Sequence, residues 1–208
     1  MVMRQHLDDA GRARIAAAVA EAETRTSAEI RLVLAECSGH YGLFALIYPA
    51  LAALIAGGVA SAFEPRIAGW MLFVGQAVVF AVTAVILQWR PLRLALVPRT
   101  VKREAAWRHA RLHYASIGLK QPHIKSAVLL FCSEAERSVE ILADDAIAEA
   151  LPPAVWEPVV EAFKMQFAAG KVADAFVGAA HACAAILAPK FPAVEGQRNE
   201  ISDDLVEL

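Results

Sequence analysis

The sequence predicts an α/β domain, a small mixed sheet with helices on both faces, that is interrupted by a two-helix transmembrane hairpin. Three observations predict this organisation: two long uncharged apolar segments in the first half of the chain, strand-like segments on both sides of them, and helical periodicity near the C-terminus. Apolar residues make up 58% of the chain, against about 45–50% in a soluble domain. Nearly all of the excess lies between Leu43 and Trp89.

The chain begins with a helix and a strand. Residues 8–26 suit a helix that Asp8 or Asp9 can cap. Residues 29–35, EIRLVLA, alternate in polarity well enough for a strand. One helix and one strand cannot enclose a core, so we expect this strand to pair with a segment beyond the apolar region.

Residues 43–63 and 67–89 are predicted to cross a membrane as a hairpin. Neither segment contains a charged side chain. At 1.5 Å per residue the first would be about 31 Å long, which matches a hydrocarbon core of roughly 30 Å. Only Glu64, Pro65 and Arg66 connect the two segments, so the helices must run antiparallel.

Small residues recur in both apolar segments. Ala53, Gly57 and Ser61 stand four apart in the first, and Ala77 and Ala81 offer a similar strip in the second. Small residues let membrane helices approach closely.

Gln76 is the most polar residue at depth in the hairpin. We interpret it as a helix–helix hydrogen-bonding group, because a transport site would need more polar residues within the membrane.

The distribution of positive charge predicts the orientation. Twelve Lys or Arg residues flank the hairpin, and its loop has only Arg66. The positive-inside rule then places both termini in the cytoplasm of a multi-pass protein of the cell (inner) membrane. The N-terminus is polar, so no cleavable signal is expected and the first apolar segment acts as its own insertion signal.

The second half supplies the partners of the first strand. Residues 126–132, SAVLLFC, suit a buried strand, and residues 137–143 follow after a short turn as the second arm of an antiparallel hairpin. The strands at 29–35 and 126–132 should be parallel with a right-handed crossover. Two amphipathic helices, at 153–168 and 172–188, close the domain.

Residues 98–117 form a basic helix with Trp107 and Tyr114. Two interpretations stay open: a surface helix whose arginines meet anionic lipid headgroups, or a solvated face of an ordinary domain helix.

Charge and cysteine usage exclude some classes of protein. The net charge of −2 argues against a nucleic-acid-binding protein. Cys37, Cys132 and Cys183 show no CxxC pair and no metal-ligand spacing, so we interpret them as small buried hydrophobes in a reducing compartment.

Several segments together resemble a known family. They are ETRTSAEIRLVLAE before two apolar spans, then SAVLLFCSEAERSVEILADDAI, Trp156, FAAG and the tail RNEISDDLVEL. The chain resembles the TPM-domain proteins, and in particular a bacterial membrane branch in which two spans interrupt the domain. The resemblance implies a TPM-like fold divided into residues 1–42 (first part of the domain), 43–89 (hairpin), 90–192 (second part) and 193–208 (polar tail).

The resemblance also implies candidate activities. Plant relatives resemble acid phosphatases or photosystem-repair factors, some of which bind calcium, and an animal relative modulates a receptor. Asp144 matches the acidic position at the family's strand end. The chain departs from the family at ADDAIAEAL, where many members have a Gly-Tyr-Gly-like turn.

Asp144 and Asp145 are the candidate metal ligands, for calcium or magnesium. Glu29, Glu36 or Glu149 would complete the site. The alternative is that these aspartates cap the following turn or helix.

His109 and His113 share a helix face but lack a third ligand for zinc.

No catalytic or cofactor-binding motif is present, so catalytic residues stay unassigned. We predict an interaction or quality-control module at the membrane, with the lipid bilayer and other membrane proteins as partners and no nucleic acid. The alternative is a divalent-metal-dependent phosphatase, which only the family resemblance supports.

Overall fold

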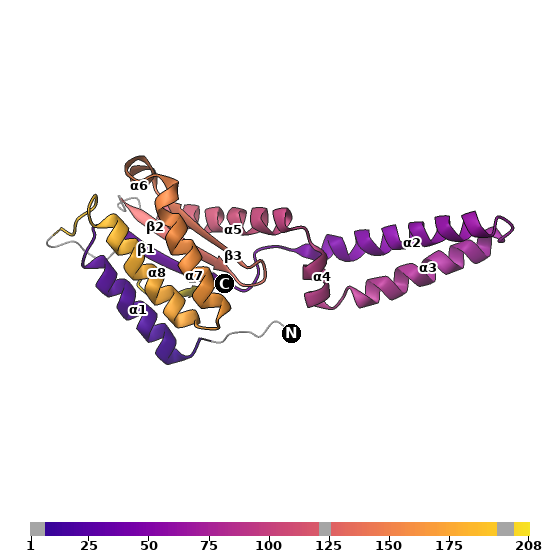
Figure 1. The fold of residues 1–208 in the computed structure, drawn as a ribbon, viewed down its shortest axis with the longest axis horizontal. Coiled ribbons are helices and arrows are strands. Elements are labelled where there is room, and N and C mark those ends of the chain that lie inside the picture. Colours follow the sequence, from indigo (N-terminus) through magenta and orange to yellow (C-terminus); the bar gives the residue numbers. More distant parts are fainter. Residues whose placement is uncertain (1–6, 121–125, 195–201) are drawn as a thin grey trace. The chain divides into compact units, whose positions relative to one another are not determined.

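A computed structural model describes residues 7–120, 126–194 and 202–208. It divides into two compact units, one built on Gly39–Lys102 and the other on Met3–Ser38 together with Arg103–Leu208. Figure 1 shows the elements of both units, coloured along the sequence. We describe each unit by itself.

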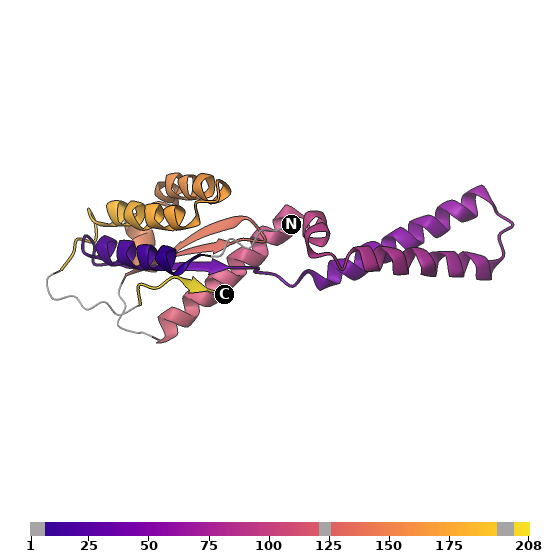
Figure 2. The same cartoon turned by 90° about the horizontal axis from the view of Figure 1, so that it is seen from below.

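The first unit is a pair of long antiparallel helices with a short third one. A 3₁₀ turn, η1 (Tyr41–Leu43), leads into α2 (Phe44–Phe63), and α3 (Gly69–Ile86) returns beside it, followed by α4 (Arg90–Leu96). The two predicted apolar segments therefore form helices (Figures 1 and 2).

Prolines set the ends of these helices. α2 stops at Phe63 because Glu64 precedes Pro65 and is extended (φ −133°, ψ 84°), as steric contact with a following proline requires. The second helix ends at Ile86, three residues before its predicted end, because Pro91 opens α4. A proline suits the first turn of a helix but not its interior.

One seam of α2 is buried, at Ala45, Pro49, Ala53 and Gly57. The predicted close approach through Ala53 and Gly57 is therefore confirmed, whereas Ser61 is exposed.

On α3 the prediction was wrong. Ala77 and Ala81 are exposed, and the half-buried positions are Leu72, Gln76, Val79, Thr83 and Ala84. Larger side chains of α3 pack over the small residues of α2, so a second small strip is not needed.

The second unit contains a four-stranded sheet in the order β3-β2-β1-β4. β1 (Glu29–Ala35) and β2 (Ala127–Ser133) are parallel along their whole length, and β2 and β3 (Ser138–Ala143) are antiparallel. The predicted fold class and these pairings are confirmed. β4 (Val206–Glu207), parallel to β1, was not predicted.

Helices cover both faces of the sheet. α1 (Asp9–Glu23), α7 (Glu157–Ala168) and α8 (Val172–Leu187) lie on one face, and α5 (Arg99–Lys120) crosses the other (Figure 2). α6 (Asp145–Ala150) follows β3, and a 3₁₀ turn, η2 (Pro153–Trp156), replaces the first turn of the predicted helix 153–168.

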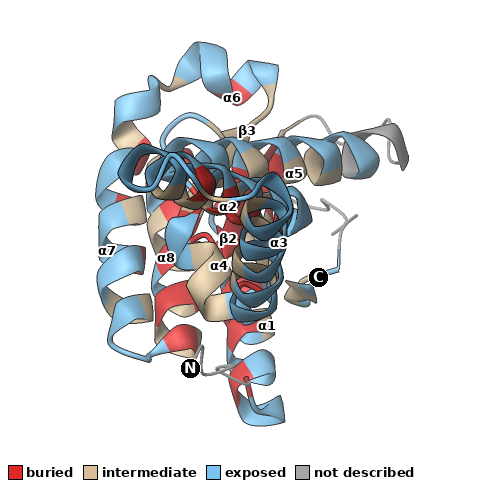
Figure 3. Ribbon diagram, turned by 90° about the vertical axis from the view of Figure 1, so that its right-hand side faces the viewer, coloured by how far each residue is buried: buried red, intermediate tan, exposed pale blue. Residues whose placement is uncertain are grey.

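Strand alternation explains the two cores. One set of strand side chains points toward α1, α7 and α8: Ile30, Leu32, Val128 and Leu130. In that layer the rings of Phe163 and Phe176 meet edge to face, with 4.9 Å between their centroids. Val33, Leu129 and Phe131 point the other way, toward Ala110 of α5. The buried residues in Figure 3 follow these two layers.

Candidate functional site

Asp144, the main candidate metal ligand, is the N-cap of α6. One carboxylate oxygen, Oδ1, accepts a hydrogen bond from the backbone N–H of Ile147 at 2.8 Å. The other, Oδ2, accepts one from the backbone N–H of Ala127 at 3.1 Å. Burial raises the pKa of Asp144, and these two hydrogen bonds oppose the shift. The capping role foreseen as the alternative is therefore present in the structure.

Asp144 follows β3, the antiparallel strand of the sheet. Ligands of open α/β sheets gather at the carboxyl ends of parallel strands. β3 is antiparallel to β2, and Ala143 pairs with Val128. Asp144 therefore lies where β1 and β2 begin, at the opposite edge.

The other proposed ligands do not all lie at the end of the sheet where Asp144 lies. Glu29 begins β1, Glu36 follows its last residue, and Asp145 and Glu149 are exposed on α6. Among the described residues, no group of three or more His, Cys, Asp or Glu side chains is arranged to hold a metal ion. A calcium or magnesium ion at Asp144 and Asp145 stays a prediction.

The two histidines of α5 face the sheet. The His109 ring meets Phe131 edge-on at 5.4 Å between centroids. His113 and Tyr114 are half-buried on the same side of the helix. Burial, followed by the charges of Asp144 and Asp145, raises the pKa of Tyr114 to about 12. This side of α5 therefore serves packing against the sheet.

A polar cluster at the carboxyl edge of the sheet was missed by the sequence analysis. Glu136, in the turn between β2 and β3, is 8% exposed. Its carboxylate accepts hydrogen bonds from the backbone N–H of Ser38 at 3.1 Å and from the hydroxyl of Ser133. The Ser38 hydroxyl donates to Ser133 at 2.8 Å, and the Cys37 thiol donates to Glu136 at 3.4 Å.

This cluster joins the end of β1 to the β2–β3 turn. Ser133 is fully buried, so its hydroxyl is shielded from a substrate, and the cluster is structural. Each buried acceptor is satisfied, as a buried carboxylate requires. The sequence held no signal for it, because the residues come together only when the two distant strands pair.

A second missed arrangement fixes residues 202–208, which we call the tail segment. Arg31 donates to the backbone carbonyl of Ser202, and Arg12 forms an ion pair with Glu207 at 2.9 Å. Residues 202–208 of the predicted polar tail thus dock on the sheet edge. Its Arg198, Asn199 and Glu200 lie outside the described residues.

Glu23 is the most perturbed carboxyl group near the tail segment. One of its oxygens accepts from the backbone N–H of Ile30 at 2.8 Å. Burial raises the pKa of Glu23 to about 8, and the charges of Glu29 and Asp203 and a hydrogen bond with Asp203 add to the shift. Glu23 is therefore largely protonated at neutral pH.

Two of the three cysteines are buried hydrophobes, as predicted. Burial raises the pKa of Cys132 and of Cys183 to about 12, so neither thiol is a nucleophile. Cys37 is half-buried.

Comparison with protein families agrees with this fold. The profile of the TPM domain matches residues 91–186, from α4 to α8. The chain therefore contains a TPM domain. The TPM match excludes α1 and β1, yet β1 is a central strand of the same sheet. The sheet of this TPM domain therefore includes a strand, β1, that precedes the apolar helices in the sequence.

A solved structure shares the fold. The NMR structure of the BA42 protein from the psychrophilic bacterium Bizionia argentinensis superposes with a TM-score of 0.61, covering 99% of this chain and 98% of that one at 14% identity. Such low identity indicates a shared fold alone. No curated protein matches the sequence.

Proposed function

We propose that this TPM-domain protein is an integral protein of the cell (inner) membrane, anchored by α2 and α3 with both termini in the cytoplasm. There the TPM domain acts as an interaction or quality-control module for other membrane proteins. The single observation that carries the proposal is the exposure of two long apolar helices.

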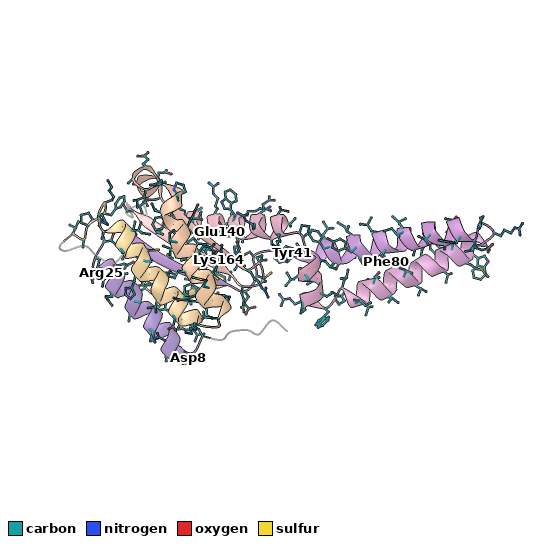
Figure 4. All side chains as sticks on the ribbon, in the orientation of Figure 1. Asp8, Arg25, Tyr41, Phe80, Glu140 and Lys164 are labelled. Atoms are coloured by element: carbon teal, nitrogen blue, oxygen red, sulfur yellow. The ribbon has the colours of Figure 1, made fainter. Side chains whose placement is uncertain are left out.

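The most apolar 18 residues of Tyr41–Phe63 have a mean hydropathy of 2.1, and 22% of these residues are buried. Gly69–Ile86 has a mean hydropathy of 2.0, and none of its residues is buried. Leu54, Phe63 and Phe73 are 65%, 86% and 71% exposed. Apolar side chains project from both helices, and Phe80 marks one of them on α3 (Figure 4). Core helices of soluble proteins bury such residues, and soluble monomers do not expose apolar areas of this extent.

Two hydroxyl groups of the apolar helices donate hydrogen bonds to backbone carbonyls of the same unit, which suits a lipid environment. The Thr83 hydroxyl donates to the backbone carbonyl of Val79 at 2.6 Å. The Tyr48 hydroxyl donates to the carbonyl of Leu96 at 3.0 Å.

The interaction role rests on what the polar clusters do. Asp144 caps a helix, and the Ser133–Glu136 cluster is closed to solvent. Both arrangements stabilise the domain, and neither presents an activated nucleophile to a substrate. The alternative, a divalent-metal-dependent phosphatase, needs a cation near Asp144 and stays a prediction tested below.

Membrane insertion and orientation can be tested together. In a Cys37→Ser background, Glu64→Cys places a thiol in the hairpin loop and Lys164→Cys places one on α7. In intact cells, an impermeant thiol reagent should label Glu64→Cys alone, and Lys164→Cys should react only after permeabilisation. Release of the protein by alkaline carbonate would refute membrane insertion, and the reverse labelling pattern would refute the orientation.

The role itself calls for a second measurement. Photocrosslinking from Glu140 on the outer strand β3 and from Met165 on α7, followed by isolation from detergent-solubilised membranes, should capture membrane proteins. Turnover of a phosphomonoester by the purified chain, lost in Asp144→Asn, would instead favour the phosphatase.

A further inference from the structure

α5 has two different faces. Its inward face packs on the sheet through Ala106 and Ala110, both fully buried. Its outward face includes five exposed residues that are basic or large and apolar: Arg103, Trp107, Arg108, Arg111 and Leu112. We call these five residues the arginine–tryptophan face; exposed residues run along α5 in Figure 3.

The arginine–tryptophan face combines cations with large apolar groups. The guanidinium of Arg111 lies over the Trp107 ring, 4.8 Å from its centroid. Trp107 is 44% exposed and Leu112 is 65% exposed. Glu104 is the only acidic residue of α5, and it forms an ion pair with Arg108 at 2.9 Å. Helices that lie at a bilayer interface combine arginines with such apolar groups on their exposed side.

Positive charge is concentrated in and just before α5. Residues 90–111 carry seven Lys or Arg and one Glu, a net charge of +6. The whole chain carries −2, so the remainder carries −8. The basic stretch begins four residues after α3 ends at Ile86 and reaches Arg111 of α5.

We propose that the arginine–tryptophan face of α5 binds anionic lipid headgroups of the cytoplasmic leaflet. The proposal rests on the membrane insertion inferred above. The arginines would contact headgroup phosphates, while Trp107 and Leu112 would enter the boundary between headgroups and acyl chains. A nucleic acid or an acidic protein would use the arginines but would leave Leu112 without an apolar partner.

This contact would dock the TPM domain through one helix. α1, α7, α8 and the edge strand β3 would then stay free to meet partners.

The test uses the full chain in nanodiscs of phosphatidylcholine alone or with about one third phosphatidylglycerol. An environment-sensitive fluorophore is attached at Ala115→Cys, an exposed position on the outward side that leaves the five face residues intact. Met165→Cys on α7, 69% exposed, is the matched control. Both variants carry Cys37→Ser, and the two remaining cysteines are buried.

The Ala115 probe should become several-fold less accessible to an aqueous quencher in the anionic nanodiscs only, and the Met165 probe should not change. Arg108→Gln with Arg111→Gln should abolish this protection, and Lys164→Gln with Lys171→Gln should preserve it. Raising salt toward 1 M should weaken the protection, because the Debye length falls from about 10 Å at 0.1 M to about 3 Å.

Equal accessibility of the Ala115 probe in both nanodiscs would overturn the proposal, and so would protection by added RNA but not by anionic lipid. A probe at Leu54→Cys on α2 separates the two ideas. If the Leu54 probe is shielded by lipid while the Ala115 probe is not, the hairpin is inserted and only the lipid contact fails. If the Leu54 probe stays open to water, membrane insertion itself fails.

Discussion

The side chain of Gln76 on α3 lies directly against Gly57 on α2. A Cβ atom on Gly57 would overlap the Nε2, Cδ and Cγ atoms of Gln76. An alanine at this position would force the Gln76 side chain to move, because the two helices approach closely there. A Cβ atom added to the neighbouring Gly58 would have no heavy atom within 4 Å apart from the nearby backbone of its own helix.

Gly57→Ala should destabilise the hairpin by about 1–3 kcal/mol, the usual cost of overpacking a close contact. Gly58→Ala is the matched control and should leave stability unchanged or slightly higher, because alanine is the better helix former. Thermal unfolding of the detergent-solubilised chain measures both.

Adding Gln76→Ala to Gly57→Ala should restore much of the lost stability. If Gly57→Ala and Gly58→Ala behave alike, the two helices do not pack as described.

The TPM domain should fold only when both of its sequence segments are present. β1 pairs with β2 at seven positions, from Glu29 with Ala127 to Ala35 with Ser133. Residues 103–208 alone would expose the edge of the buried strand β2, which favours aggregation. Residues 3–38 joined to 103–208 through a Gly/Ser linker should give a soluble, cooperatively unfolding domain by circular dichroism and size-exclusion chromatography. A monomeric, folded 103–208 fragment would show that β1 is dispensable.

Glu23 should make the domain less stable as the pH rises from about 4.5 to about 8. The pKa of Glu23 is raised from 4.5 to about 8 in the folded state, so the folded domain binds a proton that the unfolded chain has lost. Its contribution is fully present below pH 4.5, declines above it and is lost as the pH passes 8. Denaturant unfolding of the linked domain across this range measures the trend.

Glu23→Gln should flatten this pH dependence and raise stability at pH 8. The glutamine keeps an acceptor for the Ile30 N–H but has no charge to bury beside Glu29 and Asp203. Glu21→Gln, an exposed residue paired with Arg25 at 2.8 Å, is the control and should leave the profile nearly unchanged. An unaltered profile in Glu23→Gln would mean that another group causes the pH dependence.

Asp144 allows the capping and metal interpretations to be separated. If Asp144 only caps α6, calcium and magnesium should not change the melting temperature, and Asp144→Ala should cost about 1 kcal/mol. If it also binds a cation, a hundredfold excess over Kd should stabilise the unmutated domain by about 2.7 kcal/mol. Asp144→Asn should then remove most of that gain.

Asp8 provides the matched comparison, because its carboxylate caps α1 through the Gly11 N–H at 2.7 Å. Asp8→Ala should cost about as much as Asp144→Ala, and Asp8→Asn should leave any metal-induced stabilisation intact. The absence of a metal effect in the unmutated domain would end the phosphatase alternative.

Local sequence patterns were enough to predict the helices and strands whose residues repeat with a regular period. Two uncharged segments on either side of Glu64–Arg66 could form only long apolar helices, and alternation in residues 29–35 gave β1. The run 126–132, the short turn and the run 137–143 gave the β2–β3 hairpin. Because the first strand needed a partner across the apolar region, the parallel β1–β2 pairing also followed.

The edges, faces and neighbours that each residue meets depend on contacts in the folded domain. β4 has two residues, too few to show any period, and its pairing depends on the distant β1. The hydrogen bond that Asp144 accepts from the Ala127 N–H was not predicted, because it joins residues 17 positions apart. The burial of Glu23 and of Glu136 likewise arises from segments far apart in the chain. Local periodicity fixes secondary structure, whereas desolvation and hydrogen-bond partners are set by contacts that exist only in the folded domain.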